Sequence, residues 1–361
     1  MRIAVDGRPL RHPLSGIGVY TREILSRIAA DHELCVYLDR ATDRPIEFAA
    51  VLRAGPRRRL TGLATANVRF AQWAKQDKAD VFFSPRHHLP LALANIPAVV
   101  TIHDLVWRVA PATMHPLNRL LDTALMPLAL ARADRVIAVS NDTAKRIGEH
   151  GGRTDVVTIP NGSRPFPTPV PFAHTKPFFL FVGTKEPRKN LGGTVEGLRR
   201  AVNAGLDCDL VVAGPPGWGP SELTETIAHP AIAGRIVDLG PVPRAHLSGM
   251  YGACVALVLA SFYEGFGIPL AEAMAHGKPV ITSNRGAMAE VAGDAGILVD
   301  PANPASIARA FLKLGNDAET RRRLSNNALR QSRSFSWDRA ARATLDVLTD
   351  ACTSRTRGRR L

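Results

Sequence analysis

The sequence lacks any hydrophobic run long enough to cross a bilayer. Its most apolar stretches, 120–131 and 253–262, fall well short of the roughly 20 residues that a spanning helix needs. The opening residues, MRIAVDGRPL, carry charge without a continuous apolar segment behind it, which predicts no secretory leader and a cytoplasmic location. Low-complexity tracts are also missing, so fibrous and disordered classes are excluded.

Cysteine is scarce, with four residues in 361, and aromatic residues make up 6% of the chain. The cysteines (Cys35, Cys208, Cys254 and Cys352) are far apart and form no Cys-x-x-Cys pair. This spacing excludes a disulfide framework and a structural zinc site, and indicates reduced thiols in the core.

What is abundant is positive charge, a net +14 with a pI near 10.4. Residues 1–163 carry 22 basic against 15 acidic side chains and residues 164–361 carry 24 against 17, so each part is +7. A nucleic-acid-binding protein concentrates its charge on one face, so this even excess disfavours that class. The sign still favours anionic partners such as phosphates, nucleotide sugars or acidic lipid headgroups.

Short β-branched runs alternate with amphipathic segments, which predicts parallel sheets flanked by helices. The pattern stops at a segment with five prolines in 163–177 and then restarts. We therefore expect an α/β protein with two Rossmann-like doubly wound domains and a ligand cleft between them. The expected limits are 1–163 plus a C-terminal helix at about 337–354, a linker at 164–177, a second domain at 178–336 and a basic tail at 355–361. Expected strands lie at 3–5, 34–38, 81–83, 98–102, 136–139, 178–182, 209–213, 236–239, 256–259, 279–282 and 296–299.

The most informative segment runs from Ser261 to Ala275, where a buried strand is followed by a glycine loop and a helix near Ile268. Glu264 lies in the loop and Glu272 on the helix. Gly265, Phe266 and Gly267 would bring backbone N–H groups close to a diphosphate at the helix N-terminus, and carboxylates suit sugar hydroxyls. The structural alternative is that Glu264 caps the helix and Glu272 is solvated.

Other candidates also follow strands. Arg188 and Lys189 come after the strand at 178–182, where cations neutralise phosphate, unless they form an ordinary basic loop. His103 and Asp104 follow the strand at 98–102, and a histidine satisfied within the core is the alternative for His103. Gly16 and Gly18 form a weak G-x-G signal between the first strand and the next helix.

These residues resemble the retaining glycosyltransferases of family four, which have the GT-B fold. The resemblance covers nearly the whole chain and rests on Glu264-x7-Glu272 together with motifs along both halves. They are Ser15-Gly-Ile-Gly-Val-Tyr20, Thr101-Ile-His-Asp104, the segment 133–140, Ile159-Pro-Asn-Gly162, Phe181-Val-Gly183 with Pro187-Arg-Lys-Asn190, the segments 276–281 and 290–301, and Phe335-Ser-Trp337.

The resemblance implies a role for each matching position. Glu272 would bind the ribose hydroxyls and Glu264 a donor-sugar hydroxyl, while Arg188 and Lys189 would clamp the diphosphate. His103 would contact the transferred sugar, with Asp104 on the acceptor side. Many relatives carry arginine after the Val-Gly; here Thr184 stands there and Lys185 follows, so Lys185 is a reserve cation.

The resemblance also implies a retaining, metal-independent hexosyltransferase with front-face transfer. The mannosyltransferase-like form of the glutamate motif favours GDP-mannose as donor, with UDP- or dTDP-sugars as alternatives. A glycan, a lipid-linked glycan or a small molecule would be the acceptor. The alternatives from other classes are a nucleotide-sugar epimerase on the same fold and a basic nucleic-acid-binding protein.

Two metal motifs are rejected. Asp207-Cys-Asp209 precedes its strand, so its carboxylates fall at the end opposite the expected cleft. His87 and His88 are adjacent on an extended segment, point to opposite faces and have no third ligand nearby. We expect no metal.

A basic, apolar-edged segment suggests weak peripheral contact with the inner face of the membrane. It combines four arginines with large apolar groups: Arg53, Arg57, Arg58, Arg59, Leu60, Leu63, Val68, Phe70 and Trp73. Solvated charge is the alternative.

Overall fold

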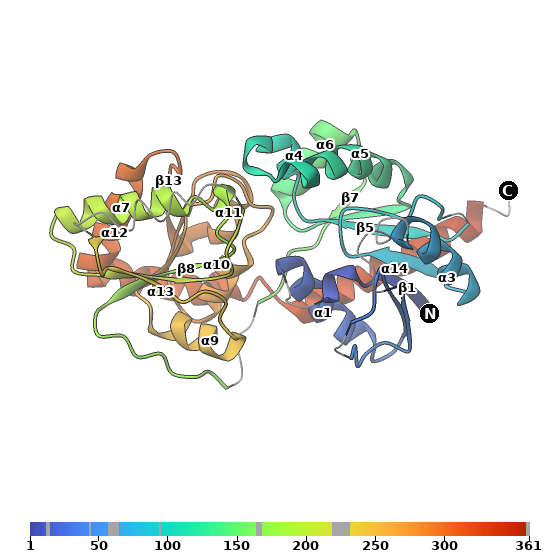
Figure 1. Ribbon diagram of the computed structural model, residues 1–361, viewed down its shortest axis with the longest axis horizontal. Coiled ribbons are helices and arrows are strands. Elements are labelled where there is room, and N and C mark those ends of the chain that lie inside the picture. Colours follow the sequence, from blue (N-terminus) through green and yellow to red (C-terminus); the bar gives the residue numbers. More distant parts are fainter. Residues whose placement is uncertain are drawn as a thin grey trace. The chain divides into compact units, whose positions relative to one another are not determined.

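The computed structural model describes residues 1–11, 15–42, 45–56, 65–93, 95–163, 168–218 and 232–358. The chain divides into two compact units, which are described separately below. Unit 1 comprises Met1–Leu105, Leu117–Asn161 and Trp337–Leu361, and unit 2 comprises Val106–Pro116 and Gly162–Ser336. The element order can be followed by colour in Figure 1.

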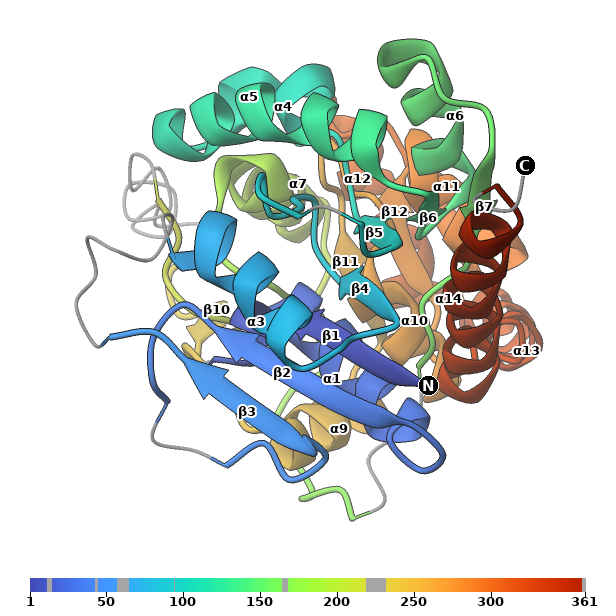
Figure 2. The same ribbon diagram turned by 90° about the vertical axis from the view of Figure 1, so that its right-hand side faces the viewer.

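Unit 1 contains a seven-stranded parallel sheet in the order β3-β2-β1-β4-β5-β6-β7, much of which faces the viewer in Figure 2. Its strands are β1 (Arg2–Asp6), β2 (Glu33–Leu38), β3 (Val51–Ala54), β4 (Val81–Ser84), β5 (Ala98–Ile102), β6 (Arg135–Ala138) and β7 (Val156–Thr158). Its helices are η1 (Arg8–Leu10), α1 (Gly16–Ile28), η3 (Thr65–Arg69), α3 (Phe70–Gln76), α5 (Pro116–Arg132), α6 (Asn141–Gly151) and α14 (Trp337–Gly358).

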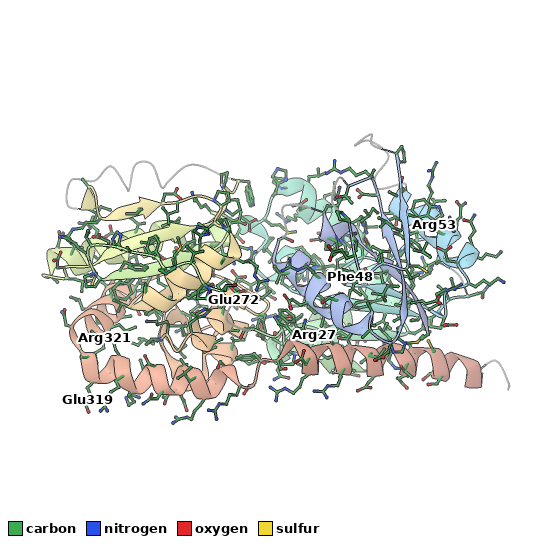
Figure 3. The ribbon with its side chains drawn as sticks, turned by 90° about the horizontal axis from the view of Figure 1, so that it is seen from below. Arg27, Phe48, Arg53, Glu272, Glu319 and Arg321 are labelled. Atoms are coloured by element: carbon green, nitrogen blue, oxygen red, sulfur yellow. The ribbon has the colours of Figure 1, made fainter. Side chains whose placement is uncertain are left out.

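The C-terminal helix belongs to unit 1, as its apolar positions require. Trp337, Leu348 and Ala351 are buried in one hydrophobic core with residues of α1 and β1. On the rim of this contact Arg27 Nε of α1 donates to Asp338 Oδ1 at 2.5 Å (Figure 3). A segment distant in sequence thus completes the core of the first sheet.

Unit 2 contains a six-stranded parallel sheet in the order β10-β9-β8-β11-β12-β13. Its strands are β8 (Phe178–Val182), β9 (Asp209–Ala213), β10 (Ile236–Asp238), β11 (Ala256–Leu259), β12 (Val280–Ser283) and β13 (Gly296–Val299). Its helices are α4 (Val106–Val109), η4 (Pro111–Thr113), η5 (Pro187–Lys189), α7 (Leu191–Asn203), α9 (Arg244–Ala253), α10 (Ile268–Ala275), α11 (Gly286–Ala292), η7 (Gly293–Ala295), α12 (Pro304–Asn316) and α13 (Ala318–Ser332).

The predicted fold class is confirmed: both sheets are parallel, doubly wound and built mainly from the expected strands. The sequence did not predict β3 or β7. The segment Val106–Pro116, which we assigned to the first domain, groups with unit 2, where the ring of His115 lies 5.7 Å from that of Trp218. Among the cysteines, Cys352 is partly buried rather than a core residue.

The proline-rich segment follows the surface of unit 2 over its described part. Val170 donates its backbone N–H to Ala245 O of α9 at 3.0 Å. Residues 164–167 of the predicted linker lie outside the described residues, as do 359–361 of the basic tail.

Candidate functional site

The loop between β11 and α10 carries Glu264, which is buried. The strand before it is apolar and fully covered, and Gly267 ends the loop with a φ of 84°, a left-handed conformation that favours glycine. Pro269 then stands in the first turn of α10 and fixes where that helix begins. The sequence predicted both the loop and the start of the helix near Ile268.

Two cations from the loop after β8 meet this carboxylate. Arg188 Nη1 donates to Glu264 Oε2 at 2.8 Å, and Lys189 Nζ lies 2.5 Å from Oε1. Ser261 Oγ donates to Oε1 at 3.1 Å. The three charged side chains converge because β8 and β11 are neighbouring parallel strands whose carboxyl ends share one edge of the sheet. We call Arg188, Lys189 and Glu264 the charged cluster.

Glu264 stays ionised over the physiological pH range. Burial by itself would raise the pKa of Glu264, but the charges of Arg188 and Lys189 outweigh it and lower that pKa to about 2. Burial lowers the pKa of the Lys189 ammonium, which Glu264 partly offsets. Because the folded pKa of Glu264 lies below its ordinary value, its contribution to stability is complete above about pH 4.5 and declines as the pH falls toward 2.

Asn190 holds the loops of unit 2 together, and sequence reasoning assigned it no role. It has a φ of 54°, which asparagine tolerates better than most residues. Its Nδ2 donates to Ala260 O at 3.0 Å and to Pro301 O at 2.7 Å. The loops after β8, β11 and β13 are therefore tied by one side chain directly after Lys189. The only signal in the sequence was its place in the Pro187-Arg-Lys-Asn190 motif.

Lys185, the reserve cation, has a different partner. Its ammonium forms an ion pair with Asp238 at the end of β10, while Arg188 and Lys189 face Glu264. The structure therefore brings together three of the predicted site residues and places Lys185 in a separate ion pair.

Glu272 lies on α10 facing α9 (Figure 3). Tyr251 OH donates to Glu272 Oε2 at 3.0 Å, and Arg244 Nη2 lies 3.4 Å from Oε1. The side chain is 14% exposed, so the solvated alternative does not describe it. A carboxylate fixed by a phenol and a guanidinium is suited to accept hydrogen bonds from a diol.

Gly16 and Gly18 stand in the first turn of α1 rather than in a loop before it. Ser15 is the N-cap and accepts a hydrogen bond from Gly18 N at 3.3 Å. The helix starts here because a serine cap satisfies one of its first amides.

Phe266 is another predicted donor-binding residue. Its side chain is buried, with its ring centroid 5.4 Å from that of Phe335, so only its backbone is suited to contact a ligand.

His103 is buried in unit 1 at the end of β5, and Asp104 after it is partly buried. Nε2 of His103 lies 2.9 Å from Pro85 O. Because a carbonyl oxygen can only accept a hydrogen bond, Nε2 carries the proton and Nδ1 is left as an acceptor. Burial lowers the pKa of His103 to about 3, so the ring is neutral. Nε2 is therefore satisfied within the core, as the alternative predicts. Nδ1 keeps a lone pair that can accept a hydrogen bond from a sugar hydroxyl.

His87, which the sequence offered only as a rejected metal ligand, lies beside His103. It stacks on His103 with 5.7 Å between ring centroids. It is buried, and neither ring nitrogen has a hydrogen-bond partner in the described part of the chain. His88 instead contacts Asp122 Oδ1 at 2.8 Å, so the adjacent histidines have separate environments.

Asp207 and Asp209 lie at the amino end of β9. Asp207 accepts from Lys176 at 2.9 Å and also pairs with Arg235, and Asp209 contacts His174 at 2.8 Å. Among the described residues no group of three or more His, Cys, Asp or Glu side chains is placed to hold a metal ion.

A cavity of about 460 Å³ opens beside β13 and α13. It is lined by Ile297, Leu298 and Leu324 among others, and none of the predicted site residues lines it.

Of the arginines in the suggested membrane segment, Arg53 is described, and it pairs with Asp77. Arg57, Arg58, Arg59, Leu60 and Leu63 lie outside the described residues, so peripheral membrane contact stays a prediction. No helix in the described ranges is both long and apolar enough to span a membrane.

Two family models match consecutive parts of the chain. The model described as Glycosyltransferase Family 4 matches residues 14–164, and that described as Glycosyl transferases group 1 matches residues 164–331. The O-antigen chain mannosyltransferase B of Escherichia coli is 28% identical over 96% of this chain and 99% of its own length. The D-inositol 3-phosphate glycosyltransferase of Corynebacterium glutamicum is 35% identical over 49% of this chain and 44% of its own.

Solved structures share the fold at low identity. A sucrose-phosphate synthase from Thermosynechococcus elongatus aligns with a TM-score of 0.80 and 20% identity, covering 98% of this chain and 100% of the other. Anabaena HepE in complex with UDP-glucose aligns with a TM-score of 0.77 and 16% identity, covering 97% and 99%.

Proposed function

Since this chain belongs to the GT-B glycosyltransferases of family four, we propose that it transfers mannose from GDP-mannose to a glycan acceptor with retention of configuration. The charged cluster carries the proposal. It pairs a buried carboxylate with two cations at the carboxyl edge of a parallel sheet, where such folds bind ligands. Support for a nucleotide-sugar donor comes from HepE, whose structure contains UDP-glucose, and support for mannose from the mannosyltransferase B of Escherichia coli.

In the proposed reaction Arg188 and Lys189 bind the donor diphosphate. Glu264 fixes both cations and accepts a hydrogen bond from a hydroxyl of the sugar. The bond between the anomeric carbon and the diphosphate oxygen breaks, and its electron pair stays on that oxygen. The acceptor hydroxyl attacks from the same face and passes its proton to the leaving phosphate. Both cations stabilise the negative charge that develops on the leaving diphosphate, and such electrostatic stabilisation is usually the largest single contribution to catalysis.

The direct test of the donor is a thermal-shift screen with GDP-mannose, UDP-glucose and dTDP-glucose. GDP-mannose at about 100 times its Kd should stabilise the protein by about 2.7 kcal/mol. Greater stabilisation by UDP-glucose would reject the mannose assignment and leave the transferase assignment in place. Release of nucleoside diphosphate without any acceptor would instead support the epimerase alternative, which no finding above favours.

Activity is expected to survive EDTA, because the proposal assigns the diphosphate to Arg188, Lys189 and backbone amides rather than to a metal. Transfer rates should agree within error with and without chelator. A loss of turnover that magnesium or manganese restores would contradict the proposal and return attention to Asp207 and Asp209.

A further inference from the structure

Three neighbouring strands of unit 1 are each followed, two residues past their last residue, by an arginine. Arg40 follows β2, Arg8 follows β1 and Arg86 follows β4. These strands are adjacent and parallel in the order β2-β1-β4. The three arginines therefore stand at the same edge of the sheet, although 78 positions of sequence separate the first from the last.

The three arginines and Arg11 line one cavity of about 350 Å³, which we call the arginine pocket. Its volume lies within the roughly 300–1,000 Å³ typical of small-molecule sites. The other lining residues are Pro9, Ser15 and Ile17. Ser15 caps α1, so the partly positive N-terminus of a 13-residue helix also stands at the pocket wall.

Two of these arginines are held in place by carboxylates. Arg8 donates from Nε to Asp6 Oδ1 at 2.9 Å and from Nη2 to Oδ2 at 2.5 Å, and its guanidinium lies 5.7 Å from the ring centroid of Phe70. Arg11 Nη1 lies 3.3 Å from Asp39 Oδ1. The side chain of Asp6 is fully buried and that of Arg8 is 11% exposed, so one guanidinium of the pocket has a fixed position.

The other two arginines carry the excess charge. Arg40 and Arg86 form no ion pair with any described residue, so the four lining guanidinium groups and their two carboxylate partners carry a formal excess charge of +2. Asp122, which contacts His88, also acts on Arg86. Burial and the charge of Arg8 lower the pKa of Arg86 to about 10, so it is still protonated at neutral pH. Positive charges held close together without enough carboxylate partners repel one another, and a bound anion would relieve that repulsion.

We propose that the arginine pocket binds a phosphate or diphosphate group on the acceptor, so that the acceptor is a phosphorylated sugar or a diphosphate-linked glycan. An excess charge of +2 balances a phosphate dianion, and each guanidinium group can donate two parallel hydrogen bonds to the phosphate oxygens. The pocket belongs to unit 1, whereas the proposed clamp for the donor diphosphate belongs to unit 2. The identification of this phosphate as the acceptor's rests on the proposed function.

Calorimetric titration with inorganic pyrophosphate tests the pocket itself. The full chain is first saturated with the nucleoside diphosphate that the donor screen selects, which occupies the donor site. Wild type should bind pyrophosphate, and the Arg40→Gln/Arg86→Gln variant should bind it at least tenfold more weakly. The matched control is Arg342→Gln, which removes one exposed arginine of α14 and should leave the Kd unchanged. Equal pyrophosphate affinity in wild type and a folded double variant would overturn the proposal.

Arg40→Gln alone keeps the test decisive if the double variant does not fold, because Arg40 has no ion pair to lose within the described residues. It should weaken pyrophosphate binding at least threefold. The Kd of the nucleoside diphosphate should be the same in wild type and variants. A rise in that Kd would instead assign the pocket to the donor and overturn the acceptor assignment. Pyrophosphate binding needs no transfer activity, so failure of this test is distinguishable from failure of the proposed function.

Discussion

Lys189→Ala is expected to lower kcat about 10²- to 10³-fold, the loss typical when one preorganised donor to a developing oxyanion is removed. Its ammonium is buried beside Glu264 and stands where the leaving diphosphate is proposed to gain charge. Alanine leaves Glu264 paired with Arg188, so the carboxylate keeps one partner. The measurement is the rate of nucleoside diphosphate release with donor and acceptor at saturation.

The matched control is Lys313→Ala, which removes an exposed lysine of α12 that pairs with Asp317. It should leave kcat unchanged. A kcat for Lys189→Ala within twofold of wild type, with an unchanged melting temperature, would show that this cation does not stabilise the leaving group.

Glu264→Gln should show how much the charged cluster contributes to the stability of the fold. A neutral amide leaves the buried Lys189 ammonium without its carboxylate and leaves Arg188 paired with Glu186. Breaking a buried ion pair in this way costs about 3–5 kcal/mol of unfolding free energy. Chemical denaturation at pH 7 measures that cost. The difference from wild type should shrink as the pH falls toward 2, since Glu264 then becomes protonated in the wild type as well.

Glu272→Ala is expected to raise the Kd of the donor nucleotide about ten- to hundredfold. Hydrogen bonds to a charged carboxylate contribute about 1.5–3 kcal/mol, and alanine removes them without offering a substitute. The loss should appear equally with GDP and with GDP-mannose, because the proposed contact is to the ribose. Calorimetry with each ligand measures it.

Two further variants interpret that result. Glu319→Ala removes an exposed carboxylate of α13, which Figure 3 shows well away from Glu272. This variant should leave nucleotide affinity unchanged. Tyr251→Phe removes one donor to Glu272 Oε2 but keeps the carboxylate, so it should weaken binding less than Glu272→Ala does. Wild-type affinity in a folded Glu272→Ala variant would refute the ribose assignment.

The fold was predictable where the middle of a strand is apolar and fully buried. β1, β2, β8 and β11 each contain such a run, covered on both faces of a parallel sheet, and these runs can be recognised in a sequence. β3 and β7 were missed; they lie at the two outer edges of the first sheet, and neither contains a buried residue. The edge strands of the second sheet, β10 and β13, were predicted although they are only partly covered, so partial cover weakens a hydrophobic pattern without always hiding it.

The sequence by itself determined the fold class, the glycine loop with Glu264 and the loop with Arg188 and Lys189. Those features depend on local composition and on the rule that ligand loops follow strands. Only the tertiary structure decided the pairings. Arg188 meets Glu264 across 76 positions, Lys185 meets Asp238, and Arg8, Arg40 and Arg86 share one pocket. The physical reason is strand order. Each sheet places side by side strands that are far apart in the sequence, and no local sequence pattern indicates which carboxyl ends become neighbours.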